Sequence, residues 1–272
     1  MTSGPRSAAN PELTELHCHL VPTVDDGART PEDAIRWLRA FRDEGIRRVV
    51  TTPHLSASHA RGRWRDRIEE RYAELAAEAA EIDGLELSLS FEIRIDEPEA
   101  DLSDRALGLG GGALLVEFPQ LMLPAFPDRM LESVTAHGWR PVLAHPERYT
   151  GIGGAYAWIP RLREAGAVMC VNAGSPWGEH GPEAERVSRR MLAEGHVDCL
   201  ASDHHGREAR STSLRDVHDR LAKAGFADAA ELLTASNPAA ILAGTECAAV
   251  PPVDFSSGLV RRLRRMVKGD DG

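Results

Sequence analysis

The sequence lacks any hydrophobic run long enough to cross a bilayer, and its opening segment, MTSGPRSAANPEL, lacks the apolar stretch of a signal peptide. We therefore expect a cytoplasmic protein. Cysteine is also scarce: the four cysteines stand at positions 18, 170, 199 and 247, and no two of them form a CxxC pair. We expect reduced packing residues rather than disulfides or zinc ligands.

Positive charge is in deficit as well. The formal net charge is −10 and the pI is about 5.6, which argues against a general nucleic-acid or membrane-surface binder. The 272 residues, 42% of them hydrophobic, suffice for one sizeable core, so we expect a single domain over residues 1–272. Residues 1–13 are expected to be flexible, and residues 256–272 to form a basic C-terminal helix or tail.

Strand and helix patterns alternate along the chain. Seven β-rich runs cover residues 15–20, 47–54, 85–94, 113–118, 140–145, 168–174 and 198–205. Helical patterns cover residues 31–45, 64–82, 127–138, 157–165, 184–195, 212–224 and 228–235. Thr30 and Pro31 give the first helix an N-cap and an N1 proline, and Gly45 ends it. This alternation predicts an α/β fold with a parallel sheet, closed or open, and favours a sevenfold β/α barrel.

Reactive side chains stand near the carboxyl end of each run, where a parallel sheet brings its residues to one face. His17 and His19 are two positions apart, so both imidazoles face the same side of an extended chain. Asp203 and His205 repeat this spacing at the last run. The sequence therefore predicts one shared site at the carboxyl ends of the strands.

Glu92 and Glu117 are carboxylates in otherwise apolar runs, where an isolated charge is costly to bury without a cation. Together with the other strand-end residues they give nine candidate metal ligands: His17, His19, Asp26, His54, Glu92, Glu117, His145, Asp203 and His205. Nine ligands suit two or three divalent ions. Mixed imidazole and carboxylate ligands favour manganese, iron or zinc over calcium or a structural zinc site.

Arg148 follows the fifth run in the stretch AHPER. The positive charge of three divalent ions would exceed the negative charge of the four candidate carboxylates. The Arg148 guanidinium adds a further positive charge, in a planar fork that suits two phosphate oxygens. A phosphate dianion fits that balance, and clustered metals can activate water for attack on phosphorus. The residues thus indicate a metal-dependent phosphomonoesterase. No cysteine precedes an arginine at the CxxxxxR spacing of cysteine phosphatases.

The ordered motifs resemble the polymerase and histidinol phosphatase (PHP) superfamily. More narrowly, they are similar to the bacterial manganese-dependent protein tyrosine phosphatases that accompany capsule and exopolysaccharide synthesis. The matching pieces are HCHLVPTVDDG, TTPH, FEIR, LLVEFP, LAHPERY, VNAGS, ASDHH and SNPAAILAG, which span nearly the whole chain. The resemblance implies a distorted seven-stranded β/α barrel, TIM-barrel-like, with three metal ions. It also implies hydrolysis of phosphotyrosine by a metal-bound hydroxide.

The resemblance further implies a division of the ligands. One ion would take His17, His19, Glu92 and Asp203; a second would take Glu92, Glu117 and His145; a third would take Asp26, His54 and His205. Arg148 would contact substrate phosphate, and Arg210 would be the second such arginine, with Arg207 close enough to compete for that role. The chain departs from the family pattern at Leu55 and at His204, neither of which is an implied ligand.

The expected partner is a phosphotyrosine protein, such as the tail of a bacterial tyrosine kinase, or a small phosphate ester. Two alternatives remain open at this point. The chain could be a small-metabolite phosphatase such as histidinol phosphatase, because substrate choice depends on loops. It could also be a non-catalytic metal-binding regulatory module that keeps the fold alone. No nucleic-acid partner and no membrane span are expected.

Overall fold

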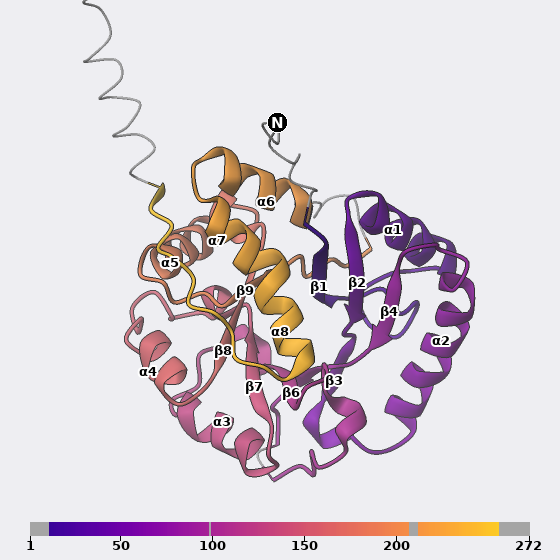
Figure 1. Ribbon diagram of the computed structural model, residues 1–272. Helices are drawn as coiled ribbons and strands as arrows, with labels where there is room; N and C mark the ends of the chain where they lie inside the picture. Colours follow the sequence, from indigo (N-terminus) through magenta and orange to yellow (C-terminus); the bar gives the residue numbers. More distant parts are fainter. Residues whose placement is uncertain (1–10, 98, 207–211, 256–272) are drawn as a thin grey trace, which may run out of the picture.

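The computed structural model describes residues 11–97, 99–206 and 212–255 (Figure 1). The expectations for Arg207, Arg210 and the basic segment 256–272 lie outside these residues, as does most of the segment 1–13 expected to be flexible. The part of that segment that is described already enters the first strand at Leu13.

Within the described residues, nine short strands form two parallel sheets. The three-stranded sheet has the order β1-β2-β4 and contains β1 (Leu13–Cys18), β2 (Ile46–Thr51) and β4 (Glu86–Leu89). The six-stranded sheet has the order β3-β5-β6-β7-β8-β9. Its strands are β3 (His54–Ser56), β5 (Glu92–Arg94), β6 (Ala113–Glu117), β7 (Arg140–Ala144), β8 (Val168–Asn172) and β9 (Cys199–Ala201).

Two of the seven expected runs each divide into two strands. Pro53 separates β2 from β3, because a proline has no N–H to donate to a ladder. In the other run, Ser90 lies between β4 and β5; its N–H bonds to Thr51 O at 3.0 Å and its hydroxyl bonds to Leu107 O. Both runs therefore begin in the smaller sheet and end in the larger one.

The expected seven-stranded closed barrel is not confirmed. Within residues 11–97, 99–206 and 212–255 the ladders remain two sheets, and only an isolated parallel bridge between Cys18 and His204 joins the segment after β9 to β1. Hydrogen bonds from His19 N to His204 O (2.7 Å) and from Asp203 N to His17 O (2.8 Å) flank this bridge. The arrangement is barrel-like in the order of its segments but interrupted in its hydrogen bonding.

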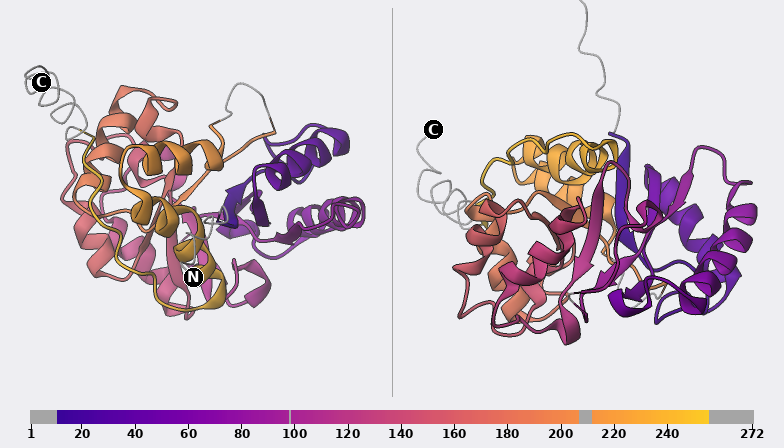
Figure 2. Two further views of the ribbon diagram at one scale, coloured as in Figure 1. Left: turned by 45° about the horizontal axis from the view of Figure 1, so that its top comes forward. Right: turned by 90° about the horizontal axis from the view of Figure 1, so that it is seen from below.

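Helices follow most strands and cover the outside of the sheets (Figures 1 and 2). They are α1 (Pro31–Asp43), α2 (Arg63–Ala79), α3 (Pro127–Ala136), α4 (Trp158–Glu164), α5 (Pro182–Ala193), α6 (Leu214–Lys223), α7 (Ala227–Glu231) and α8 (Asn237–Ala243). The N-cap of α1 is confirmed, because Thr30 Oγ1 accepts a hydrogen bond from Asp33 N at 3.1 Å. A π-helical turn, Leu232–Ser236, joins α7 to α8, so the last expected helix extends further than its pattern indicated.

The hydrophobic interior has two parts. The larger cluster packs mainly between the sheets and the surrounding helices. The smaller one lies inside the ring of strands and includes Leu16, Val142 and Cys170, with Ile241 of α8 added at one end. Figure 1 shows α8 lying across the middle of the strands, near the amino ends of β1 and β6. This helix closes one end of the strand array and leaves the carboxyl ends for the site.

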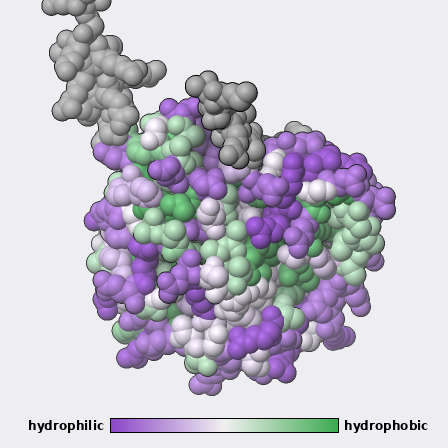
Figure 3. Space-filling model, in the orientation of Figure 1, coloured by the Kyte–Doolittle hydropathy of each residue, from purple (hydrophilic) through white to green (hydrophobic). Residues whose placement is uncertain are grey.

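Polar residues dominate the face of the molecule shown in Figure 3, with smaller apolar areas between them. The exposed large apolar side chains in the described chain are Trp64, Met122 and Phe126. None of the helices in the described ranges combines the length and the apolar character that crossing a bilayer requires.

Candidate metal centre

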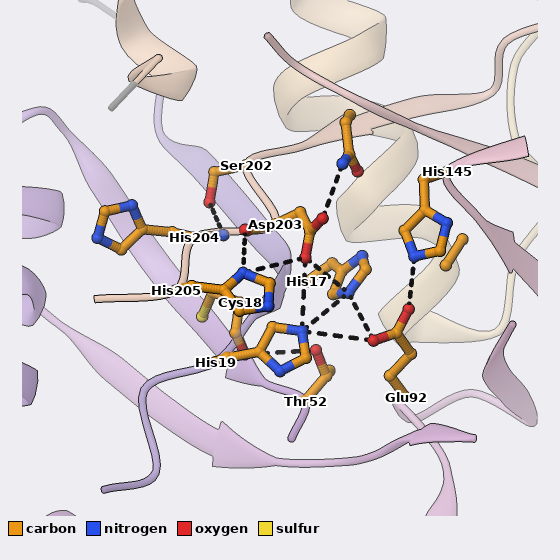
Figure 4. A network of polar contacts seen from close by, with 12 residues as sticks. His17, Cys18, His19, Thr52, Glu92, His145, Ser202, Asp203, His204 and His205 are labelled. Carbon is orange, nitrogen blue, oxygen red and sulfur yellow. Dashed lines mark hydrogen bonds and ion pairs between the residues drawn. The ribbon is translucent and has the colours of Figure 1, made fainter. Parts of the chain in front are cut away.

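The structure brings all nine predicted ligands together at the carboxyl ends of the strands. Figure 4 shows six of them: His17, His19, Glu92, His145, Asp203 and His205. Six of the nine line a cavity of about 620 Å³: Asp26, His54, Glu117, His145, Asp203 and His205. The walls of this cavity include Ser56, Arg94, Asp96, Pro119, Gln120, Leu121 and Arg148. The stretch FPQLMLPAFP, residues 118–127, contributes to both the core and the cavity. Phe118 is buried in the core, and the next three residues line the cavity.

The first donor group contains His17, His19, Glu92 and Asp203, as expected. Nε2 of His17 and Nε2 of His19 lie 3.3 Å apart. Glu92 Oε2 lies 3.3 and 3.4 Å from these two nitrogens, and Asp203 Oδ1 lies 3.4 and 3.5 Å from them. All four side chains are almost completely buried. Four donor atoms thus face one another in a space from which water is excluded.

Asp25 fixes the orientation of the His19 ring. Its Oδ2 lies 2.7 Å from His19 Nδ1 and also accepts a hydrogen bond from His54 N at 3.0 Å. A carboxylate on Nδ1 holds the proton there and leaves Nε2 as a lone pair, which is how metal-binding histidines are commonly supported. Position 27 of this turn requires a glycine, because a Cβ there would lie 2.6 Å from the His19 Cβ.

Glu92 connects the first group to a second one, which contains Glu92, Glu117 and His54, with His145 beside them. Its Oε2, which faces His17 and His19, is also 2.8 Å from His54 Nδ1, while its Oε1 lies 2.7 Å from His145 Nε2. Glu117 Oε1 lies 3.3 Å from the same nitrogen of His54. The strand register explains the convergence, since His54 pairs with Glu92 across β3 and β5.

A third group contains Asp26, His54 and His205, with His19 beside them. Asp26 Oδ1 lies 3.6 Å from His54 Nε2 and 3.3 Å from His205 Nε2. The two ring nitrogens of His54 therefore face different groups: Nδ1 faces the second and Nε2 the third. The expected division gave this histidine to the third group alone, whereas its ring lies between the two.

Two of these residues have a left-handed backbone that non-glycine residues rarely adopt. His145 has φ of 35° at the end of β7, and Asp203 has φ of 51° just after β9. Such conformations persist where the surroundings impose them, and they are concentrated at functional sites. Here they turn each side chain from its strand toward the cavity.

Opposite charges shift the pKa of the central groups strongly. Burial alone would raise the pKa of Glu92, but the charges of His17 and His54 lower it well below its usual range. Burial alone would lower the pKa of His54, but the charge of Glu92 outweighs it and raises the pKa to about 9. The pKa of His19 is likewise raised, mainly by Asp25 against the effect of burial. These shifts all follow from imidazoles packed against buried carboxylates.

The donor set fits divalent ions. His17 Nδ1 is buried without a hydrogen-bond partner among the described residues, and Glu92 Oε2 and His54 Nδ1, although 2.8 Å apart, also lack a hydrogen bond there. Most buried polar atoms in proteins have one. The cavity lining also includes four carboxylates against two arginines. Cations between the donor atoms would satisfy these atoms and offset the negative charge, and the donors, imidazole and carboxylate without thiolate, suit manganese, iron or zinc.

Arg148 reaches the cavity from the turn after β7. Its Nη1 donates to Asp203 Oδ2 at 2.7 Å, and Asn172 Nδ2 donates to the same oxygen at 2.8 Å. The other oxygen of Asp203 remains directed at the histidines of the first group. Arg148 therefore both holds a candidate ligand and presents a guanidinium to the cavity.

Arg94 is a site residue that the sequence reasoning missed. It lines the cavity from β5, and both its Nε and its Nη2 lie 3.0 Å from Glu117 Oε1. The signal was present, because Arg94 follows Glu92 by two positions, the same spacing that links His17 to His19.

The other expectations concern residues beside the site. His204 packs its ring against Trp37 and Phe41, at centroid distances of 4.1 and 5.6 Å, and so points away from the donor groups. All four cysteines are free, as expected, and three of them are buried.

Sequence comparison matches residues 13–243 to the family described as "Capsular polysaccharide synthesis, CpsB/CapC". The chain belongs to the CpsB/CapC family. Relatives that carry the name tyrosine-protein phosphatase include YwqE of Bacillus subtilis and CpsB of Streptococcus pneumoniae. YwqE of Bacillus subtilis is 30% identical over 212 residues, covering 75% of this chain and 82% of YwqE. CpsB of Streptococcus pneumoniae is 25% identical over 249 residues, covering 85% of this chain and 98% of CpsB.

Solved structures agree with this assignment to the CpsB/CapC family, so the resemblance inferred from the motifs is confirmed. A crystal structure from work on YwqE and CpsB, described there as unique metal-dependent tyrosine phosphatases, matches with a TM-score of 0.73 and 26% identity over 89% of this chain and 99% of that one. A phosphotriesterase homology protein of Escherichia coli matches with a TM-score of 0.50 and 15% identity, which shows a shared fold alone.

Proposed function

We propose that this protein is a metal-dependent phosphomonoesterase that hydrolyses phosphotyrosine in proteins. The observation that carries the proposal is that the three donor groups share ligands. Glu92 belongs to the first and second groups, and His54 to the second and third. The groups lie beside a cavity that Arg148 also lines. Shared ligands suit a cluster of ions rather than separate structural ions. The names of the relatives support phosphotyrosine as the substrate.

Each residue of the site has a distinct task in this proposal. His17, His19, Glu92, Asp203, Glu117, His145, Asp26, His54 and His205 would hold two or three ions. The ions would supply the Lewis acidity that activates water and offsets charge on phosphorus. Arg148 would hold phosphoryl oxygens with its free N–H groups, while Asp25 would keep the His19 ring in place. The buried floor would keep bulk water out.

The substrate side of the proposal depends on the cavity walls. Pro119 and Leu121 give one wall of the cavity an apolar surface beside the donor groups. Such a surface suits the aromatic ring of a tyrosyl leaving group. The family's description supports a role in the regulation of exopolysaccharide or capsule synthesis, with a phosphotyrosine protein such as a bacterial tyrosine kinase tail as partner. The four free cysteines support a reducing compartment such as the cytoplasm. Manganese is the proposed ion.

The decisive experiment compares substrates on the metal-loaded protein. Steady-state kinetics with a phosphotyrosine peptide and with histidinol phosphate should give the higher kcat/KM for the peptide. Rapid turnover of histidinol phosphate with negligible peptide turnover would instead identify a small-metabolite phosphatase.

A second experiment separates an enzyme from a non-catalytic metal-binding module. Metal content by mass spectrometry should show two or three tightly bound ions, and hydrolysis of p-nitrophenyl phosphate should be abolished in His54→Ala. Reconstitution with manganese, iron and zinc in parallel should give the highest activity with manganese. Bound metal without hydrolysis under any of these ions would support the non-catalytic module.

A further inference from the structure

We propose that Arg94 is a second phosphate-binding arginine of this cavity, and that metal binding at Glu117 releases it toward the substrate. The proposal rests on the proposed phosphomonoesterase function. It concerns a residue in the middle of a strand, whereas Arg148 lies in the turn after β7.

The position of Arg94 follows from the strand register. Arg94 pairs with Glu117 across β5 and β6, and it stands two residues after Glu92 on the same face of β5. Its side chain is 38% exposed, whereas that of Glu117 is 4% exposed. The guanidinium therefore lies at the boundary between the buried donor groups and the open cavity.

The hydrogen bonds of Arg94 leave much of its capacity unused. Toward described residues, its side chain donates through Nε and Nη2, and both bonds go to one oxygen, Glu117 Oε1. A guanidinium carries five N–H donors in one plane, so three remain for another acceptor. Phosphate, with several acceptor oxygens, is the anion that matches such a fork.

Arg94 and Arg148 hold their carboxylates in different ways. Arg148 binds Asp203 Oδ2 and leaves Oδ1 facing His17 and His19. Arg94 instead binds Glu117 Oε1, the same oxygen that lies 3.3 Å from His54 Nδ1. A cation in the second group would compete with Arg94 for this oxygen. Its occupancy would weaken the Arg94 contact and free the guanidinium.

The negative charge of the cavity explains why a released Arg94 guanidinium would help phosphate to bind. Asp26, Asp96, Glu117 and Asp203 line the cavity, and Arg94 and Arg148 are the cationic side chains that line it within the described residues. A phosphate dianion entering between four carboxylates needs every positive group available. A cation at Glu117 would take over the role of Arg94 as its counter-charge and leave the guanidinium available to the phosphate.

The test measures phosphate binding as well as turnover. Arg94→Ala and Arg94→Lys are compared with wild type in metal-saturated protein, using calorimetry with inorganic phosphate and steady-state kinetics with p-nitrophenyl phosphate. Arg61→Ala is the matched control, because Arg61 pairs with Asp101 and lies outside the cavity lining. Metal content and the thermal midpoint of every variant are recorded.

Arg94→Ala should weaken phosphate binding and raise KM by about tenfold or more, the loss expected for a charge-assisted hydrogen bond. Its metal content should match wild type, Arg94→Lys should recover part of the loss, and Arg61→Ala should behave as wild type. In metal-free protein, phosphate affinity should differ little between wild type and Arg94→Ala, because Glu117 then still holds the guanidinium.

Two results would overturn the proposal. Phosphate affinity within twofold of wild type in metal-saturated Arg94→Ala would show that Arg94 does not bind phosphate. A defect that disappears entirely in excess metal would show that Arg94 only holds Glu117 in position. Because calorimetry with inorganic phosphate needs no turnover, absence of hydrolysis in the wild type would contradict the proposed function without deciding the role of Arg94.

Discussion

The two ends of the strand array both carry a cavity lined by arginines and carboxylates. The cavity at the carboxyl ends measures about 620 Å³, and the one at the amino ends, near the starts of β7 and β8, about 460 Å³. At the amino ends the charges are satisfied: Asp198 accepts hydrogen bonds from Arg163 Nη2 at 2.7 Å and from Met169 N at 2.8 Å. At the carboxyl ends, by contrast, Glu92 Oε2 and His54 Nδ1 lie 2.8 Å apart, yet neither has a hydrogen bond to a described residue. Buried donor atoms without hydrogen bonds, more than size or charge, distinguish a reactive cavity.

The sharpest test of this comparison is Glu92→Gln, which keeps the shape of the side chain and removes its charge. Because Glu92 serves both the first and the second donor group, activity should fall roughly a thousandfold, equivalent to about 4 kcal/mol of transition-state stabilisation. Metal content should fall in parallel. Kinetics with p-nitrophenyl phosphate and metal analysis check both, and near-normal values would remove Glu92 from the centre of the site.

Asp25→Asn tests the support around the donor groups. The amide can no longer hold the Nδ1 proton of His19 as a carboxylate does, so metal affinity should fall by roughly 10- to 100-fold. A competitive chelator titration measures this change. Activity should return at high metal concentration, which distinguishes a loss of orientation from a loss of a ligand.

Asp198→Asn is the matched change at the amino ends. It removes the charge that pairs with the partly exposed Arg163, so the free energy of unfolding should fall by about 2 kcal/mol. Chemical denaturation provides the measurement. The folded variant should keep the wild-type kcat/KM and metal content. A loss of either would show that the cavity at the amino ends also contributes to activity.

The last prediction concerns the pH dependence of stability in metal-free protein. Because the pKa of His54 is raised to about 9 in the folded chain, its protonation stabilises the fold fully below the unfolded pKa of about 6.5, and this stabilisation is lost as pH rises toward 9. The thermal midpoint should therefore fall by roughly 3 °C for each 1 kcal/mol lost over this range. Metal-loaded protein should show a flatter profile, because ions replace the protons.

The sequence alone predicted most of the site, because strand periodicity and parallel topology determine which side chains share a face. The i, i+2 spacing of His17 and His19 and the carboxylates in apolar runs predicted residues that the structure brings together. Periodicity could not show that His54 lies between two groups, since that depends on ring position. It also could not show that Pro53 and Ser90 divide two runs, so a single seven-stranded barrel was expected where two sheets are found.

Glu92, whose two oxygens face different histidines, has a consequence for how the site is assembled. An ion that enters one donor group would fix the carboxylate that the neighbouring group needs. Loading would then be a linked sequence, and a metal titration should depart from the curve of independent sites. Removal should work the same way: loss of one ion would loosen the others, so a chelator should empty the centre as a unit.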